Sequence, residues 1–138
     1  MRAAVLFFPS KSREKVREIS RALADGIGAQ GYDVDVVDGS QDVNTKLTIY
    51  THIAVVAEQQ TLFTGKIPEG ISEFLSGSGI VGGKKSFAFV IKKALGNTKA
   101  LKRLMHAMEH EGMFLRYSDV LATPEDSRII GTKLKIAN

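Results

Sequence analysis

Short runs of apolar residues alternate along this chain with longer stretches in which apolar positions recur every three or four residues. The apolar runs lack the polar interruptions of a half-exposed strand, so they indicate strands buried on both faces. Strands are predicted at Ala3–Phe8, Tyr32–Val37, His52–Ala57 and Ser86–Ile91, with a fifth at Met113–Tyr117 that could continue to Thr123. Tyr32–Val37 differs from the others because it alternates partly with aspartate.

The amphipathic stretches predict helices with one buried face. Ser10–Ala29 carries apolar residues at helical spacing, with Ser12 as an N-cap candidate and three glycines near its end. Further helices are predicted over Ile67–Leu75 and Asn97–Glu111. Gln41–Tyr50 is polar and offers at most a short, weak helix.

The last segment, 124–138, leaves two interpretations open. Its apolar residues could support a brief helix or an extended end packed on the core, and they are Ile129, Ile130, Leu134 and Ile136. Strands that alternate with helices predict a doubly wound α/β fold, a parallel sheet in three α/β/α layers. No linker or repeat interrupts residues 1–138, so we expect a single domain.

The amino-acid composition limits the kinds of site that the protein can contain. The 138 residues are 43% hydrophobic and 25% charged, which is typical of a globular domain. The chain has no cysteine, which excludes disulfides, thiolate metal sites and a cysteine nucleophile. A cytoplasmic location is the simplest expectation. The net charge of +4 favours anionic ligands or partners but is too small to indicate nucleic acid, and no apolar stretch is long enough to cross a membrane.

One candidate ligand site lies at the carboxyl edge of the predicted sheet, where ligands bind in doubly wound folds. Three loops meet there, 9–15, 58–65 and 92–97. The first leads into a helix, whose N-terminal N–H groups favour an anion such as phosphate. Its candidate residues are Ser10, Lys11, Ser12, Arg13 and Lys15. The alternative is that Ser12 only caps the helix and the cations are solvated.

Two other motifs match known functional patterns, but their positions in the chain argue against those functions. Residues 77–82 match G-x-G-x-x-G, but they follow a predicted helix and precede a strand, the reverse of a dinucleotide site. His106, Glu109 and His110 match H-x-x-E-H, yet only 28 residues follow in which a third zinc ligand could occur. A pair of solvent-facing histidines is therefore favoured. No catalytic set and no metal site is predicted.

The stretch Phe63–Leu75 resembles the flavodoxins, in which an aromatic pair, glycine and proline precede a helix containing Phe-Leu. Gly83-Lys84-Lys85 and the spacing from Gly96 to Gly112 fit the same family. The resemblance runs from Ala3 to about Val120. It implies a five-stranded sheet of order 2-1-3-4-5 and an FMN-binding protein in electron transfer.

The resemblance also implies roles for residues of the three loops. Ser10, Ser12 and Lys15 would hold the FMN phosphate. One side of the flavin would be lined by Gln60, Thr61, Leu62 and Phe63, and the other by Leu95 and Gly96. The implied partner is a redox protein, which we expect to be acidic because this chain is basic. Assembly into a homo-oligomer is left open as a further possibility. An electron carrier is favoured over a stand-alone enzyme, with a flavin-dependent reductase as a weaker interpretation.

A second hypothesis rests on departures from the family pattern. Arg13, Glu14 and Lys15 replace the glycine, asparagine and final hydroxyl residue of the flavodoxin phosphate loop, and Thr64 replaces one aromatic residue. A side chain at Arg13 can obstruct the close backbone approach that glycine permits. The alternative is a flavodoxin-fold domain that has lost its flavin and works as a binding or interaction module. It predicts that the loops at the carboxyl edge are collapsed or crowded.

Overall fold

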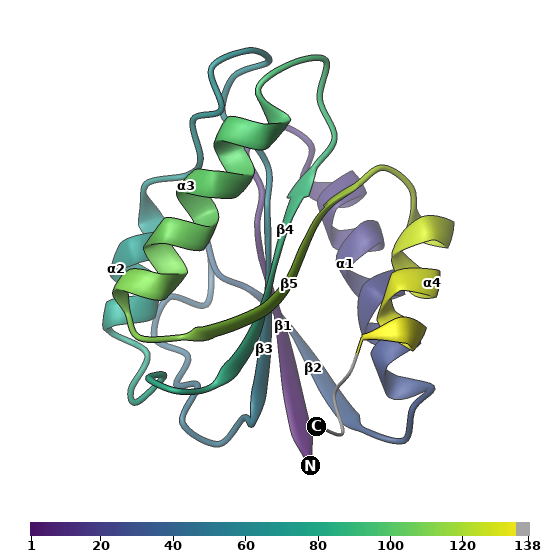
Figure 1. Ribbon diagram of the computed structural model, residues 1–138, viewed down its shortest axis with the longest axis vertical. Coiled ribbons are helices and arrows are strands. Elements are labelled where there is room, and N and C mark those ends of the chain that lie inside the picture. Colours follow the sequence, from purple (N-terminus) through teal and green to yellow (C-terminus); the bar gives the residue numbers. More distant parts are fainter. Residues whose placement is uncertain (135–138) are drawn as a thin grey trace.

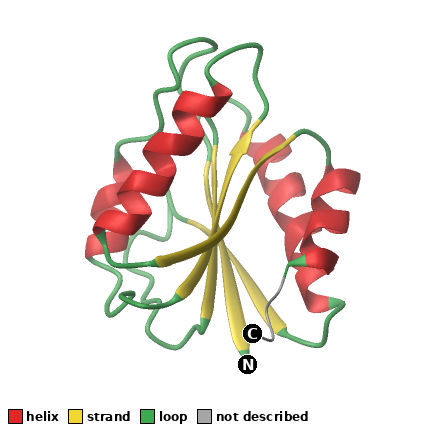
Figure 2. Ribbon diagram, in the orientation of Figure 1, coloured by secondary structure: helices red, strands yellow, loops and turns green. Residues whose placement is uncertain are grey.

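The computed structural model describes residues 1–134, and a five-stranded parallel sheet forms its centre (Figures 1 and 2). The strands are β1 (Arg2–Phe8), β2 (Asp33–Asp38), β3 (His52–Ala57), β4 (Lys85–Ile91) and β5 (Phe114–Leu121). Their order is β2-β1-β3-β4-β5 and all pairs are parallel. The predicted fold class and strand order are confirmed.

Among residues 1–134, four helices cover the two faces of the sheet. They are α1 (Arg13–Gly28), α2 (Gly70–Ser76), α3 (Asn97–His110) and α4 (Pro124–Lys133). In Figure 1, α1 and α4 lie on one side of the sheet, and α2 and α3 lie on the other. Each face buries its own apolar cluster, one including Val16, Ile19 and Leu23 of α1, the other including Phe74 of α2 and Leu104 of α3.

The structure corrects several predicted boundaries. α1 begins at Arg13, as the predicted N-cap at Ser12 implies, after a bend at residues 10–11 that follows β1. Ser12 occupies the N-cap position, but its hydroxyl makes no cap hydrogen bond. The weak helix considered for Gln41–Tyr50 does not form; this stretch is turn and irregular chain, and Leu47 and Tyr50 anchor it in the core. β5 runs to Leu121 and contains the predicted strand only in part.

The last segment forms a helix. Thr123 caps α4 by accepting a hydrogen bond from the backbone N–H of Asp126 on its side chain, and Pro124 occupies the first turn. Of the apolar residues predicted to support this segment, Ile130 and Leu134 pack against the core cluster, while Ile129 is exposed. Ile136 lies outside the described residues.

The contact between α1 and α4 is close because both helices carry glycine where they cross. A Cβ atom at Gly26 would lie 2.9 Å from the Cα of Gly131 and would overlap the backbone carbonyl oxygen of Arg128. A Cβ at Gly131 would in turn lie 2.9 Å from the Cα of Gly26. The Gln30 side chain then donates to the carbonyl oxygens of Gly131 and Leu134, at 2.7 and 2.9 Å. The two helices therefore pack backbone against backbone.

Parallel strands bring the three loops of the candidate site to one edge. Phe8 at the end of β1 pairs with Ala57 at the end of β3, and Ala57 pairs with Val90 near the end of β4. The segments that follow these strands therefore emerge side by side at the upper edge in Figure 1. This edge is called the carboxyl edge below.

Candidate functional site at the carboxyl edge

The turn between β1 and α1 already holds an anion. Its occupant is the carboxylate of Glu58, the first residue after β3. One oxygen, Oε1, accepts hydrogen bonds from three successive backbone N–H groups, those of Ser10, Lys11 and Ser12, at 2.6, 2.9 and 3.0 Å. These are the donors that a phosphate bound to this turn would need. In this structure they are committed to a side chain of the same molecule.

The second oxygen of Glu58 is paired with a cation from a third loop. Lys93 donates from Nζ to Oε2 at 2.7 Å, and the side chains of Glu58 and Lys93 are 0% and 14% exposed. Lys93 follows β4, so the carboxylate joins the ends of β1, β3 and β4. Hydrogen bonds to a charged carboxylate are among the stronger ones in proteins. The contact fixes three loops to one another through a single side chain.

The environment of Glu58 keeps it ionised. Burial by itself raises the pKa of the carboxyl group. The hydrogen bond from Lys93, those from the backbone of Ser12 and Ser10, and the positive charge of Lys93 outweigh burial and lower the pKa from 4.5 to about 2. At neutral pH the turn therefore contains a full negative charge.

The loops after β3 and β4 are joined directly. The backbone N–H of Leu95 donates to the carbonyl oxygen of Leu62 at 3.2 Å. Gly65 and Gly96 approach so closely that a Cβ on Gly96 would lie 2.8 Å from the backbone nitrogen of Gly65. Both glycines have positive φ, 72° and 82°, a conformation that other residues rarely adopt. The two loops leave no gap between their backbones at this point.

Two side-chain amides, of the buried Gln59 and the half-buried Asn97, reinforce this closure. The Gln59 side chain, only 2% exposed, accepts from the N–H of Gly65 and donates to the carbonyl oxygen of Leu95 and to Asn97 Oδ1. Asn97 closes its own loop by accepting from the N–H of Lys93 and donating to the Lys93 carbonyl oxygen. The polar atoms at the base of both loops are therefore bonded within the protein.

The predicted phosphate residues lie around the turn, but their side chains do not converge on one point. Ser10, Lys11 and Lys15 are exposed. Arg13 turns to the end of β2, where it pairs with the buried Asp38 and contacts Ser40. Ser10, Lys11 and Ser12 contact an anion, the Glu58 carboxylate, and they do so through their backbone N–H groups. Whether these side chains bind a ligand stays a prediction.

The residues predicted to line a flavin lie on the two joined loops. Leu62, Phe63 and Leu95 are 51, 60 and 60% exposed. Gln60 and Thr61 are half-buried, and the hydroxyl of Thr61 bonds to that of Thr64. Gly96 lies where the loops touch. The structure thus brings all these residues to one edge, with their larger apolar side chains directed outward.

The residues that organise this edge were not predicted from the sequence. Glu58, Gln59, Lys93 and Asn97 carry most of its buried polar contacts, yet none was assigned a role. The available signal was the position of Glu58, a charged residue directly after a strand that is buried throughout. A carboxylate there faces the turn after β1, because the two strands are neighbours. His106 and His110 are exposed on α3, and no group of potential metal ligands occurs among residues 1–134.

Comparison with solved structures identifies the fold. A flavodoxin from the domain Archaea superimposes with a TM-score of 0.69 at 15% identity, covering 96% of this chain and 94% of that one. Flavodoxin 1 from Bacillus cereus gives 0.71 at 17% identity, with 95% of each chain covered. The chain has a flavodoxin-like fold. A flavodoxin from Streptococcus pneumonia TIGR4 also matches, with a TM-score of 0.67 and 17% identity over the full length of both chains.

Sequence comparisons add no relative. No protein-family model matches the chain, and no curated protein matches it either. At 10–17% identity, the likeness to flavodoxins concerns the path of the backbone. Within the described residues, no helix is long and apolar enough to span a membrane.

FMN is the cofactor that a flavodoxin-like fold implies, and this carboxyl edge does not fit it. The phosphate would need the three N–H groups that Glu58 occupies, and it would meet the negative charge of that carboxylate. The ring would need space between the loops after β3 and β4, which are hydrogen-bonded to each other at Leu62 and Leu95. The N–H groups of the turn are thus already bonded to Glu58, and the loops that would flank the ring are bonded to each other.

Proposed function

We propose that this flavodoxin-fold domain works without FMN, as a binding and interaction module. The observation that carries the proposal is the direct contact between the loops after β3 and β4. In the flavin hypothesis these loops lie on opposite faces of the ring, whereas here the Leu95 N–H bonds to Leu62 and Gln59 bridges both loops. A surface made by two mutually bonded loops suits contact with another molecule from outside.

An FMN-dependent electron carrier is the second candidate, and the likeness to flavodoxins over nearly the whole chain favours it. It would require the Leu62–Leu95 contact to open and Glu58 to leave the turn. The ionised carboxylate would then have to give up four hydrogen bonds. A flavin-dependent reductase would need the same rearrangement. Because these contacts oppose it, we favour the module.

A titration with FMN tests the proposal. We expect the purified protein to be colourless, and excess FMN to cause neither quenching of flavin fluorescence nor a rise in melting temperature. A flavodoxin stripped of its FMN provides the positive control in the same titration. Flavin binding by this protein at low micromolar concentration or tighter would overturn the proposal and restore the electron carrier.

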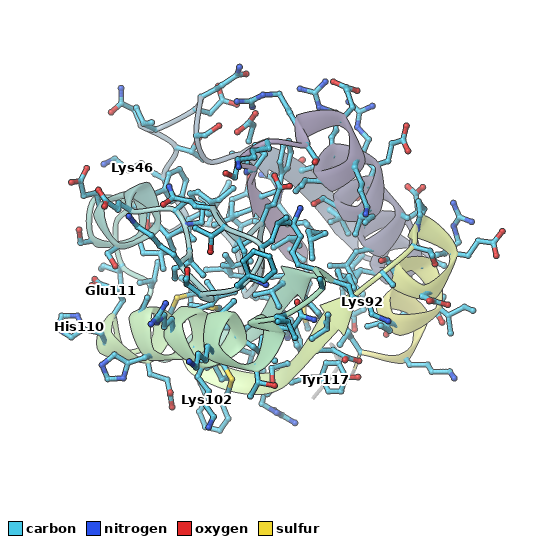
Figure 3. The ribbon with its side chains drawn as sticks, turned by 90° about the horizontal axis from the view of Figure 1, so that it is seen from above. Lys46, Lys92, Lys102, His110, Glu111 and Tyr117 are labelled. Atoms are coloured by element: carbon cyan, nitrogen blue, oxygen red, sulfur yellow. The ribbon has the colours of Figure 1, made fainter. Side chains whose placement is uncertain are left out.

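The exposed part of the joined loops indicates the kind of partner. Phe63 and Leu95 are large apolar side chains that are each 60% exposed. Cations lie next to them, because Arg103 donates to the Thr64 carbonyl oxygen at 3.0 Å and the Cβ of Lys99 lies near Gly65. Figure 3 looks down on this edge and shows Lys92 between α3 and α4. We therefore propose an acidic protein segment with an apolar anchor as the partner.

A synthetic acidic peptide that contains one Phe and one Leu among Glu and Asp residues can probe this surface. We expect it to shift backbone NMR signals of residues 61–64 and 92–99, with affinity that falls as salt is raised. The double variant Phe63→Ser and Leu95→Ser should weaken binding about tenfold or more. Ile80→Ser is the control, because Ile80 is 73% exposed in the loop before β4, at the other edge of the sheet. Equal loss in the control, or equal binding of a neutral peptide, would contradict this partner.

A further inference from the structure

A cavity of about 530 Å³ lies between α4 and the edge strand β5, on the face of the sheet that α1 and α4 cover. Among residues 1–134, its lining comes from β4, β5 and α4 and consists of Phe87, Arg116, Tyr117, Ile130, Lys133 and Leu134. None of the three loops of the carboxyl edge contributes to this lining. The volume is within the range of small-molecule sites, so the cavity is a separate candidate site.

The packing of α4 explains why this space exists. The glycines at 26 and 131 bring the backbones of α1 and α4 together, and Gln30 ties the end of α4 to α1. Few residues of α4 approach β5. The floor of the cavity is firm, because the buried Phe87 ring stacks on the buried His52 ring with the two planes 9° apart. A ligand would therefore meet a largely preformed apolar surface.

A β-bulge directs two neighbouring side chains of β5 toward this cavity. Ser86 of β4 pairs with Leu115, but the next residue, Phe87, pairs with Tyr117, so the register passes over Arg116. Neighbouring residues of a regular strand point to opposite faces of the sheet, whereas here Arg116 and Tyr117 line the same cavity. Figure 3 shows Tyr117 at the outer edge of the sheet. Bulges that redirect a side chain in this way are frequent beside functional sites.

The charges at the cavity favour a ligand with one negative charge. Arg116 and Lys133 line it, and no acidic side chain of the described residues does. The Arg116 guanidinium lies over the Phe114 ring, 5.8 Å from its centre, and Lys133 is exposed in the last turn of α4. One carboxylate is close, because the Tyr117 hydroxyl donates to Asp119 at 2.7 Å. Two cations and one carboxylate leave one positive charge in excess.

We propose that this cavity binds an amphipathic monocarboxylate, a molecule with one carboxylate and an apolar chain. The carboxylate lies between Arg116 and Lys133, which can both donate charge-assisted hydrogen bonds to it. The apolar chain packs on Phe87, Tyr117 and Ile130. A phosphate monoester matches the cavity less well, because it carries up to two negative charges. The site is independent of the partner proposed above, which contacts the carboxyl edge.

Octanoate is the probe for this site, and 1-octanol is the matched compound without the charge. We expect isothermal titration calorimetry to give a dissociation constant on the order of 0.1 mM for octanoate, with 1-octanol binding at least about tenfold more weakly. Nuclear Overhauser contacts from the octanoate chain to the Tyr117 ring and the Ile130 methyl groups should locate the ligand in the cavity. No octanoate binding below about 1 mM would overturn the proposal.

Two variants of α4 separate a specific charge from general attraction. Lys133→Gln should weaken octanoate binding about tenfold, because it removes a charge-assisted hydrogen bond. Arg128→Gln is the control, since Arg128 is an exposed cation on the same helix outside the lining, and the change should be less than about twofold. Arg116→Gln provides a second test of the charge from β5, with circular dichroism to confirm folding.

Three results would contradict this site. They are equal binding of octanoate and 1-octanol, equal losses in Lys133→Gln and Arg128→Gln, and octanoate contacts at Phe63 and Leu95 in place of the cavity. The titration with FMN concerns the opposite part of the chain's contacts, the carboxyl edge, so its outcome decides the proposed function and leaves the octanoate result unchanged.

Discussion

Replacement of Lys93 by methionine is expected to lower the free energy of unfolding by about 3 kcal/mol at neutral pH. Methionine retains most of the apolar stem but removes the cation, so the fully buried Glu58 carboxylate loses the only side chain among residues 1–134 that is hydrogen-bonded to it. A buried charge without a partner lowers the free energy of unfolding by more than an exposed ion pair raises it. Unfolding in urea, followed by circular dichroism, measures the change.

The effect should depend on pH in a defined direction. The folded-state pKa of Glu58, about 2, lies below its ordinary value of 4.5, so its ionisation stabilises the fold fully above pH 4.5. That contribution, about 3 kcal/mol, is lost as the pH falls from 4.5 to 2. Without Lys93 the folded-state pKa is closer to 4.5 and less stability remains to be lost. The difference between the variant and the unmodified protein should therefore shrink as the pH falls through this range.

Lys92→Met is the matched control. Lys92 is the neighbouring residue and is exposed, and Figure 3 shows it at the same edge of the molecule. Its replacement should change the unfolding free energy by less than about 0.5 kcal/mol. If the two variants lose equal stability, or if the loss for Lys93→Met is constant between pH 7 and pH 3, the account of the Glu58 site is wrong.

Alanine at Gly26 is expected to destabilise the protein by about 3 kcal/mol through overpacking. The added methyl group would overlap the Arg128 carbonyl oxygen and press on the backbone of Gly131. Backbone atoms cannot rotate away as the end of a side chain can, so α4 has to move outward as a unit. That movement would also break the bonds from Gln30 to Gly131 and Leu134.

Gly28→Ala provides the comparison within the same helix. An added Cβ at Gly28 meets no atom within 4 Å, and alanine favours the helix by up to about 1 kcal/mol over glycine. This control should therefore be as stable as the unmodified protein or slightly more stable. Chemical unfolding compares the two variants, and hydrogen exchange of α4 amides shows whether that helix has come loose. A Gly26→Ala protein as stable as Gly28→Ala would refute the close crossing of α1 and α4.

The fold could be predicted because its signals are local. The uninterrupted apolar runs of β1, β3 and β4 and the regular spacing of apolar residues in α1 and α3 each act over a few residues. The strand order came from the resemblance of Phe63–Leu75 to flavodoxins, since periodicity gives no order. The end of β5 was left open between Tyr117 and Thr123 because its residues alternate weakly between exposed and half-buried positions.

Only the location of the candidate site could be predicted from the sequence. The three loops were expected at one edge, and they are there. The contacts between these loops were not predictable, because the hydrogen bonds between Glu58 and Ser10–Ser12 span more than 45 residues and depend on the exact register of β1 against β3. The departures at Arg13, Glu14 and Lys15 indicated that the turn was unusual. They did not indicate that the carboxylate of Glu58, the first residue after β3, would occupy the turn.

The carboxylate in the β1–α1 turn has a consequence for how the stability of the domain responds to its surroundings. A cofactor that dissociates stabilises its protein by an amount that depends on the logarithm of the free cofactor concentration. Glu58 is part of the chain, so it is present at one equivalent in every molecule and cannot be diluted away. If the domain works without FMN, as proposed, its melting temperature should be the same with or without added flavin and should not fall on dialysis.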